Sequence, residues 1–418
     1  MPKFVVQGGH KLEGEVHVSG SKNATLPIMC AALLSDEKTT LTNVPDIADI
    51  KAMTDVMEGL GVKTEFNNHT LEIDPSGLKD SRPNDDIVCK MRASILLLGP
   101  LIANFKKAEM AFPGGCVLGK RSVAAHTKAL EDLGCKVENG DKDLKIQSKE
   151  LKGTTVIMEE RSVTATENAI MVAIKAEGKT TIKLAATEPH VQDLCNFLKE
   201  MGAEIKGTGS STLEIEGEKK LKGVNYRITG DYLEAGTFAI AAALTNGNVK
   251  IKGIQTDHLD SFWQKLKEVG IDFDLEPNEV HIKGYKSLTS IKTLKTAVFP
   301  SFPTDLQAPF AVLLTQAKGV TKIFETMFEG RLNYLAELER MGAKIELLNP
   351  HQAIVIGPSP LKGLPISSYD IRAGAAMVLA ALTAEGETEI SNINYLDRGY
   401  EKLEEKLQSL GAQIQRID

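Results

Sequence analysis

The sequence lacks an apolar segment long enough to cross a membrane. Its longest apolar run, around residues 95–103, falls well short of the ~20 residues that a transmembrane helix needs. The first ten residues contain no apolar stretch of the length found in signal peptides. We therefore expect a cytoplasmic protein that has no membrane partner.

Cysteine is scarce, with five residues in 418. Their odd number and wide spacing argue against a disulfide framework and against CxxC metal sites. HExxH and GxxxxGK[ST] are absent, and no GxGxxG stands in a strand-turn-helix context, so metalloprotease, P-loop and dinucleotide-binding functions lack support. A net charge of −7 disfavours nonspecific nucleic-acid binding. An anionic substrate would therefore have to be held by local cations.

What the sequence does have is a sixfold internal repeat. In each copy a glycine follows an amphipathic helical stretch and leads into an alternating, strand-like segment. Successive copies are 68 to 73 residues apart. The six glycines are Gly61, Gly134, Gly202, Gly270, Gly342 and Gly411. Each is predicted to cap the C-terminus of a helix.

A second repeated segment, rich in small residues, alternates with the helix–glycine–strand segment. Its six copies are residues 23–41, 92–110, 164–182, 234–251, 304–323 and 372–390. The helix in this second segment is apolar on nearly every side and is predicted to be buried within a layer of strands. The chain exceeds what one core usually supports, so six units of ~70 residues divide naturally as three plus three. Two closed domains and a continuous solenoid both remain open.

The first positions of the predicted buried helices are unusually polar. They are Asn23, Arg92, Thr164, Glu234, Thr304 and Arg372, with Lys22, Asp305 and Asp370 beside them. Helix N-termini present free N–H groups and a positive dipole, which suit phosphate and carboxylate ligands. N-capping and interdomain salt bridges would explain the threonine and the two aspartates equally well. Cations such as Lys22, Arg92 and Arg372 oppose the dipole, and a bound anion would resolve that conflict.

Residues 113–121 combine three glycines, Cys116 and two cations in nine positions. A thiol in an electropositive loop should have a lowered pKa and be available as an acid or a nucleophile. A glycine turn with an incidental cysteine is the alternative. The remaining cysteines, which lie in helical or apolar stretches, are predicted to serve packing. They are Cys30, Cys89, Cys135 and Cys195.

Residues 19–27, with the sequence SGSKNATLP, resemble the N-terminal signature of the bacterial UDP-N-acetylglucosamine enolpyruvyl transferases. Further similar segments follow in order along the whole chain. They are residues 91–94, 113–116 with Arg121, 165–168, 234–237, 302–307, 328–331, 370–372 and 397–400. The sister family of the shikimate pathway typically has serine after the signature lysine and lacks the cysteine loop. Asn23 and Cys116 therefore favour the sugar-nucleotide branch.

This resemblance implies an α+β fold of two similar domains. Each is an inverse α/β barrel, or α/β prism, of three repeats, and the active site lies in the cleft between them. The family's chain path implies one domain of residues 22–229, with the cysteine loop, and a second of residues 1–21 plus 230–418. Closure of two such domains on a ligand would exclude water.

The reaction implied by the resemblance is an addition followed by an elimination. The sugar 3-hydroxyl attacks the central carbon of phosphoenolpyruvate while the methylene is protonated, and phosphate then leaves, without a metal or an organic cofactor. Asp305 would accept the hydroxyl proton. Cys116 would protonate the methylene carbon or hold a covalent phospholactoyl adduct.

The same resemblance assigns the substrate-binding residues. The two anionic groups of phosphoenolpyruvate would be held by Lys22, Arg121 and Arg398. The next candidates for this role are Arg331 and Arg372. The nucleotide-sugar contacts map to Asn23, Arg92, Arg121, Ser162, Val163 and Met327, and Thr304 stands beside Asp305. Asp370 and Asp397 would orient arginines or take part in the site, and both alternatives stay open.

Several positions depart from the family pattern where it holds the uridine. Ser122 and Ala124 stand where a proline and an acidic residue are common, and Thr164 stands where glycine is common. A lost acceptor for the base could cost about 1 to 3 kcal/mol. His190 replaces a more usual glutamate, but it and His126 are predicted to be ordinary surface or core residues.

Three functions are consistent with the sequence. The leading hypothesis is transfer to UDP-N-acetylglucosamine in peptidoglycan precursor synthesis. The alternatives are a paralogue that uses another nucleotide sugar and a catalytically silent homologue that binds nucleotide sugars.

Overall fold

The computed structural model describes residues 2–89, 91–112, 114 and 123–417. These residues form two compact units, one of residues 2–19 with 230–417 and the other within residues 20–229. The boundaries expected from the sequence are 21/22 and 229/230. The predicted residues Cys116, Arg121 and Ser122 lie outside the described part of the chain.

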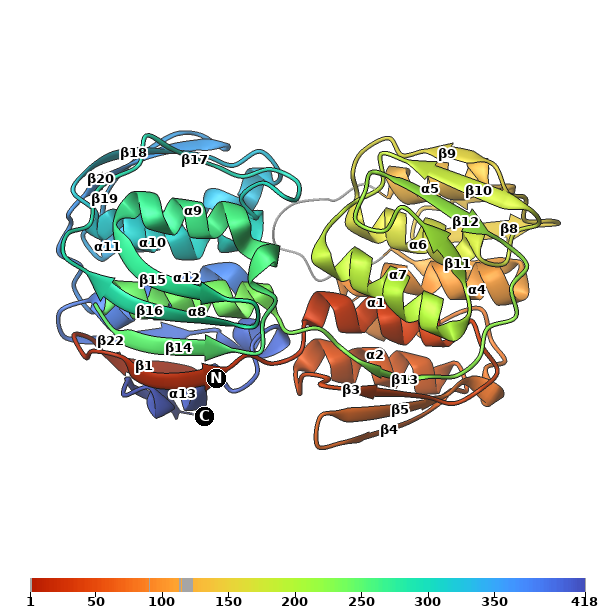
Figure 1. Cartoon of the computed structure of the whole chain (residues 1–418), viewed down its shortest axis with the longest axis horizontal. Helices are drawn as coiled ribbons and strands as arrows, with labels where there is room; N and C mark the ends of the chain where they lie inside the picture. The colour runs from red at the N-terminus through yellow and green to blue at the C-terminus, as the bar shows by residue number, and fades with distance from the viewer. Residues whose placement is uncertain (1, 90, 113, 115–122, 418) are drawn as a thin grey trace. The chain divides into compact units, whose positions relative to one another are not determined.

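The unit of residues 2–19 and 230–417 is built from sheets and helices (Figure 1). Its sheets, in strand order, are β21(Ile366–Ser367)-β22(Glu387–Ser391)-β1(Lys3–Gln7)-β23(Gln413–Ile417), β15(Ile271–Glu276)-β16(Glu279–Tyr285)-β14(Asn248–Lys252)-β2(Glu13–His17) and β17(Thr293–Lys295)-β18(Gly319–Phe324)-β20(Gln352–Gly357)-β19(Lys344–Asn349). Its α-helices are α8(Tyr232–Leu244), α9(Asp260–Val269), α10(Gln307–Gln316), α11(Leu335–Arg340), α12(Ile371–Thr383) and α13(Leu403–Ser409). Its 3-10 helices are η3(Thr256–Leu259), η4(Thr304–Leu306), η5(Glu329–Leu332) and η6(Ile393–Arg398).

The unit within residues 20–229 repeats this construction. Its sheets are β13(Asn225–Arg227)-β3(Thr39–Thr42)-β5(Thr70–Asp74)-β4(Lys63–Asn67), β11(Glu204–Lys206)-β12(Thr212–Glu216)-β10(Lys179–Lys183)-β9(Thr155–Ile157) and β6(Lys107–Ala111)-β8(Asp143–Ser148)-β7(Cys135–Asn139). Its α-helices are α1(Lys22–Ala32), α2(Ala48–Gly59), α3(Asp85–Val88), α4(Leu98–Phe105), α5(Ala124–Asp132), α6(Val163–Ala173) and α7(Pro189–Met201). Its 3-10 helices are η1(Pro75–Gly77) and η2(Arg92–Leu97).

Each unit is closed by pairing between its first and last segments. In the unit of residues 20–229, β13 from the end pairs in parallel with β3 from the start, with Tyr226 opposite Leu41. In the other unit, β1 lies between β22 and β23, so the first strand joins the last repeat. Of the two arrangements left open by the sequence, the structure thus has two units that each close on themselves rather than one continuous solenoid.

The second helix of each repeat is buried, as predicted. All residues of α8 are buried, and so is nearly all of α12. In the unit of residues 2–19 and 230–417, α8, α10 and α12 each contact the other two. In the other unit, α1, α4 and α6 do the same. The sheets lie outside these helices, which is the inverse α/β arrangement expected from the resemblance.

The six repeat glycines all adopt the left-handed backbone conformation. Their φ angles lie between 95° and 112°, a region that L side chains rarely enter. Gly202 and Gly270 are the C-caps of α7 and α9, as predicted. The other four glycines stand one residue after the C-caps, which are Leu60, Leu133, Met341 and Leu410.

Two predicted helix starts are corrected by the structure. Arg92 and Thr304 begin the 3-10 helices η2 and η4, and the α-helices α4 and α10 start only after these. Both α-helices carry a proline at their third position, Pro100 and Pro309. Proline cannot donate the hydrogen bond to the residue four before it, which favours a 3-10 turn ahead of these helices.

The cysteine predictions are confirmed for Cys30, Cys135 and Cys195, which are buried, but are wrong for Cys89, which is exposed. Cys89 follows the four-residue helix α3 as its C-cap. A helix this short covers little of its own end, so the thiol stays at the surface.

No helix in the described ranges combines the length and the apolar character that a membrane span requires.

Burial of Glu167 in α6 generates a prediction about stability. Burial raises the pKa of Glu167 well above its ordinary value, and the negative charge of Glu188 adds to this effect. The folded state therefore holds the proton more tightly than the unfolded chain, so the free energy of unfolding falls as the pH rises above about 4.5. Glu167→Gln should raise the free energy of unfolding, and with it the melting temperature, more at pH 8 than at pH 5. The gain in free energy of unfolding is about 1.4 kcal/mol for each pKa unit removed.

Thermal unfolding of the wild type and Glu167→Gln at both pH values provides the measurement. Glu160→Gln removes the same charge from an exposed position and serves as the control. A Glu167→Gln protein no more stable than the wild type at pH 8 would contradict the prediction.

Candidate active site

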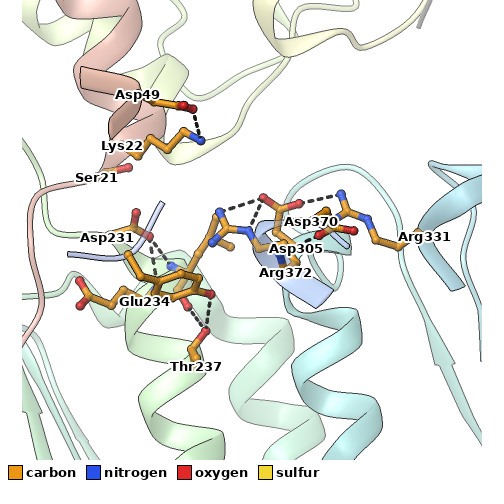
Figure 2. Close-up of polar contacts among 12 residues, drawn as sticks. Ser21, Lys22, Asp49, Asp231, Glu234, Thr237, Asp305, Arg331, Asp370 and Arg372 are labelled. Carbon is orange, nitrogen blue, oxygen red and sulfur yellow. Dashed lines mark hydrogen bonds and ion pairs between the residues drawn. The ribbon is translucent and has the colours of Figure 1, made fainter. Parts of the chain in front are cut away.

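The side chain of Asp305 lies between two arginines in the unit of residues 2–19 and 230–417 (Figure 2). Arg331 Nη2 donates to Asp305 Oδ1 at 2.9 Å, and Arg372 Nε donates to Asp305 Oδ2 at 3.1 Å. Both arginines are about 95% buried, whereas a quarter of the Asp305 side chain is exposed. The sequence predicted these three residues as site residues, and the structure brings them together.

Local structure fixes each of the three side chains. Asp305 is the middle residue of η4, and Arg331 lies in η5. Arg372 is the second residue of α12, whose N-cap is Asp370. The Asp370 carboxylate accepts the backbone N–H of Arg372 at 2.7 Å and that of Ala373 at 2.9 Å. Asp370 is therefore a helix cap, one of the two alternatives that the sequence left open.

The two arginines keep donors that the described residues leave unused. Arg331 Nε and Arg372 Nη1 are buried and have no hydrogen-bond partner within the described part of the chain. A buried guanidinium N–H without an acceptor is costly, and an anionic ligand would satisfy it. Arg331 also lies 5.0 Å from the Phe328 ring centroid, and Arg372 lies 5.5 Å from that of Tyr400.

Charge around Arg372 favours its protonated form. Burial opposes that charge, but the Asp305 carboxylate and Tyr400 outweigh burial, so the pKa of Arg372 is raised. The cation is thus present at every working pH. Thr304, beside Asp305, donates its hydroxyl proton to Glu325 Oε2 at 2.9 Å and does not cap a helix.

In the unit of residues 20–229, Lys22 begins α1 and forms an ion pair with Asp49. Lys22 Nζ lies 2.6 Å from Asp49 Oδ2, and both side chains are almost buried. Ser21 is the N-cap and accepts the N–H of Ala24 at 3.4 Å. Asn23 follows Lys22 on the same first turn and is half-buried. Asp49 explains how a cation is tolerated at this helix start, and nothing in the sequence pattern identified it.

A hydrogen-bonded cluster stands at the start of α6 in the same unit. The Asn168 amide is oriented by Gly99, whose N–H it accepts, and by the Ile95 carbonyl, to which it donates, both at 2.9 Å. Its nitrogen also donates to His126 Nδ1 at 2.9 Å. His126 Nε2 therefore carries the ring proton and donates it to Thr164 Oγ1 at 3.0 Å.

His126 is a buried neutral side chain, as the sequence analysis expected of an ordinary core histidine. Burial lowers its pKa to about 3, and the positive charge of Arg92 acts in the same direction. Arg92 is the half-buried first residue of η2. His190, in the first turn of α7, is also buried.

The remaining predicted residues occupy separate places. Arg398 ends η6 and is half-buried, while its neighbour Asp397 pairs with Arg416 at 2.6 Å and 3.1 Å. Asp397 thus orients an arginine, but one outside the predicted set. Ser162 and Val163 are the N-cap and the first residue of α6, and Met327 is 38% exposed.

No three His, Cys, Asp or Glu side chains gather to form a metal site in the part of the chain that the structure describes.

Comparison with known proteins places these residues in a family context. The family model described as EPSP synthase (3-phosphoshikimate 1-carboxyvinyltransferase) matches residues 6–407. A UDP-N-acetylglucosamine 1-carboxyvinyltransferase of Halothermothrix orenii is 42% identical over 417 residues and covers 100% of both chains. The similarly named protein 2 of Carboxydothermus hydrogenoformans is 43% identical over 419 residues, again covering 100% of both chains.

Solved structures support the fold. The enolpyruvyl transferase NikO from Streptomyces tendae superimposes with a TM-score of 0.91 at 24% identity, covering 99% of this chain and 98% of that one. An EPSP synthase from Acinetobacter baumannii gives 0.78 at 21% identity and covers 100% of both chains. At these identities the likeness concerns the fold alone.

The buried state of His126 generates a second stability prediction. Its folded pKa, about 3, lies below the ordinary value of 6.5, so the stability it contributes is complete above pH 6.5 and is lost as the pH falls. His126→Gln keeps polar contacts without titrating. The difference in unfolding free energy between wild type and variant should therefore shrink from pH 7 to pH 5, by up to about 1.4 kcal/mol per pH unit.

Urea unfolding at each pH measures this difference directly, which cancels the opposite pH dependence of Glu167. His10→Gln, at a partly buried position of the other unit, is the control. A difference that stays constant between pH 7 and pH 5 would show that His126 does not resist protonation.

Proposed function

We propose a function for this chain from one premise: it belongs to the EPSP synthase (3-phosphoshikimate 1-carboxyvinyltransferase) family, and within it to the UDP-N-acetylglucosamine 1-carboxyvinyltransferases. In our proposal it transfers the carboxyvinyl group of phosphoenolpyruvate to the 3-hydroxyl of UDP-N-acetylglucosamine and releases phosphate. This reaction would be the first committed step of peptidoglycan precursor synthesis, in the cytoplasm.

The observation that carries the proposal is the Asp305 cluster. Arg331 and Arg372 each hold Asp305 and each keep a buried N–H without a partner in the described residues. Phosphoenolpyruvate carries a carboxylate and a phosphate close together, which matches two adjacent guanidinium groups. A site that holds a carboxylate base beside unused arginine donors suits a reaction between a hydroxyl and an anionic donor.

The proposed chemistry balances in two steps. In the addition, the sugar 3-oxygen bonds to the central carbon of phosphoenolpyruvate, Asp305 takes the hydroxyl proton, and Cys116 gives a proton to the methylene carbon. In the elimination, the bond from the central carbon to the phosphate oxygen breaks and the methyl group returns a proton, which restores the vinyl group. Asp305, the carboxylate that Arg331 and Arg372 hold in place, is proposed as the acceptor of this proton.

Lys22 has a proposed role in binding phosphoenolpyruvate. Its ammonium group is held by Asp49 at 2.6 Å and nearly buried. A substrate anion would share this cation with Asp49, which holds the ammonium group in place before the substrate binds. Arg121 and Arg398 are proposed to bind the same substrate.

The nucleotide sugar is the other proposed substrate. The residues proposed to contact it are Asn23, Arg92, Arg121, Ser162, Val163, Thr304, Asp305 and Met327. Most of the described members are half-buried, which leaves part of each side chain for a ligand. Asp370 is proposed to act indirectly, because it caps the N-terminus of α12, the helix that carries Arg372.

One observation favours a second candidate, transfer to a different nucleotide sugar. Thr164 stands where related enzymes commonly have glycine, and its oxygen accepts the His126 proton. Its own hydroxyl proton is therefore available to a ligand acceptor. An added donor near the α6 start would change which nucleotide or sugar is preferred.

A panel of nucleotide sugars tests the substrate. We expect phosphate release from phosphoenolpyruvate with UDP-N-acetylglucosamine, at a kcat/KM at least ~10-fold above that for other UDP-sugars. Phosphate is measured with a coupled colorimetric assay. No phosphate release with UDP-N-acetylglucosamine, together with release with another UDP-sugar, would establish the second candidate. Ligand-induced thermal stabilisation without any turnover would indicate a silent binding protein.

A thiol-directed inhibitor tests the role of Cys116. The epoxide phosphonate fosfomycin resembles phosphoenolpyruvate. We expect the Cys116 sulfur to bond to an epoxide carbon while the carbon–oxygen bond breaks and the oxygen takes up a proton. Intact-mass measurement with nucleotide sugar present should show addition of one inhibitor molecule, and activity should be lost in parallel.

The exposed thiol of Cys89 supplies the matched control. Cys89→Ser should still be modified, whereas Cys116→Ser should not be and should lose about 10²-fold or more in kcat. Modification of the Cys116→Ser protein would assign the reactive thiol elsewhere.

A further inference from the structure

We propose that Tyr400 and Thr237 are positioning residues that fix the guanidinium group of Arg372 for the anionic substrate. This inference rests on the proposed role of Arg372 in binding phosphoenolpyruvate. The residues come from separate elements of one unit: Thr237 lies on α8, Arg372 on α12, and Tyr400 shortly after η6. All three are at least 95% buried.

The direction of the hydrogen bonds follows from the helix geometry. Thr237 Oγ1 donates its proton to the Leu233 carbonyl, one turn earlier on α8, at 2.9 Å. Thr237 Oγ1 also lies 2.9 Å from the Tyr400 hydroxyl. Because the threonine proton is already used, the threonine oxygen accepts here and the tyrosine donates. The Tyr400 proton is thereby turned toward α8.

This orientation leaves the lone pairs of the Tyr400 oxygen available to a cation. The nearby cation is Arg372, whose guanidinium carbon lies 5.5 Å from the centroid of the Tyr400 ring. Tyr400 is among the groups that favour the charged form of Arg372, after the opposing effect of burial and the larger contribution of Asp305. A tyrosine whose proton pointed at Arg372 would repel it instead.

Arg372 is therefore held from two directions. Asp305 Oδ2 lies 3.1 Å from both Nε and Nη2, and the Tyr400 hydroxyl oxygen accepts a hydrogen bond from the guanidinium group. Nη1 is buried and has no partner within the described residues. With the other nitrogens fixed, the direction of the Nη1 donor is set before the substrate arrives, which reduces the ordering required on binding.

Tyr400→Phe removes the hydroxyl and keeps the ring. We expect the KM for phosphoenolpyruvate to rise about 10-fold, with kcat changed by no more than about 3-fold, because binding rather than bond making is affected. Thr237→Val removes the acceptor and should raise KM in the same direction. Thr237→Ser keeps both hydrogen bonds and should restore a KM near that of the wild type.

Tyr226→Phe is the matched control. Tyr226 is also a buried tyrosine, and its hydroxyl donates to Asp193 Oδ1 at 2.6 Å, but it lies in the unit of residues 20–229. Its substitution should lower the melting temperature without raising the KM. Melting temperatures of all the variants separate a loss of stability from a loss of positioning.

Two outcomes overturn the inference. The first is a folded Tyr400→Phe or Thr237→Val enzyme with the wild-type KM, even if its melting temperature is lower. The second applies if the wild type shows no turnover, a result that by itself refutes only the proposed function. Calorimetric titration with phosphoenolpyruvate then decides the inference separately: weaker binding by both variants supports it, while equal affinity or no binding by the wild type overturns it.

Discussion

Each unit encloses three apolar helices behind its sheets, and this enclosure decides where polar chemistry can stand. A polar side chain inside such a helix costs free energy unless it finds a partner. The N-termini of the helices are an exception, because their free backbone N–H groups need hydrogen-bond acceptors, and polar side chains supply them. Asp370 and Asp231 satisfy it as N-caps of α12 and α8. Two candidate site residues stand at such ends: Arg372 after its cap Asp370, and Lys22 after the cap Ser21 of α1.

Cations at helix starts create a second requirement, since they oppose the helix dipole. The structure meets it with carboxylates from other elements: Asp49 on α2 for Lys22, and Asp305 in η4 for Arg372. Pairs of this kind contribute little net stability, because the ions lose their hydration. They do hold the cations in fixed positions. The unused donors of Arg331 and Arg372 show that pairing within the described chain leaves capacity for an anion.

The sequence predicted the features that follow from local pattern and missed the partners that hold the site's cations. Periodic glycines such as Gly202 and apolar helices such as α8 follow from local pattern, and both are confirmed. The partners Asp49 and Tyr400 could not be found in this way, because each meets its cation through the packing of a different element, which local pattern does not reveal. The exposed thiol of Cys89, the C-cap of the four-residue helix α3, was also missed.

Three polar residues inside the buried helices show how partners decide function. Asn168 on α6 uses both ends of its amide on η2, α4 and His126, so it ties repeats together. Thr237 on α8 bonds its own helix and Tyr400, which joins α8 to the segment after η6. Glu167, next to Asn168 in the chain, has an oxygen with no partner among the described residues, and burial raises its pKa instead. Asn168 and Thr237 therefore order their neighbours through hydrogen bonds, whereas Glu167 responds to burial by holding its proton more tightly.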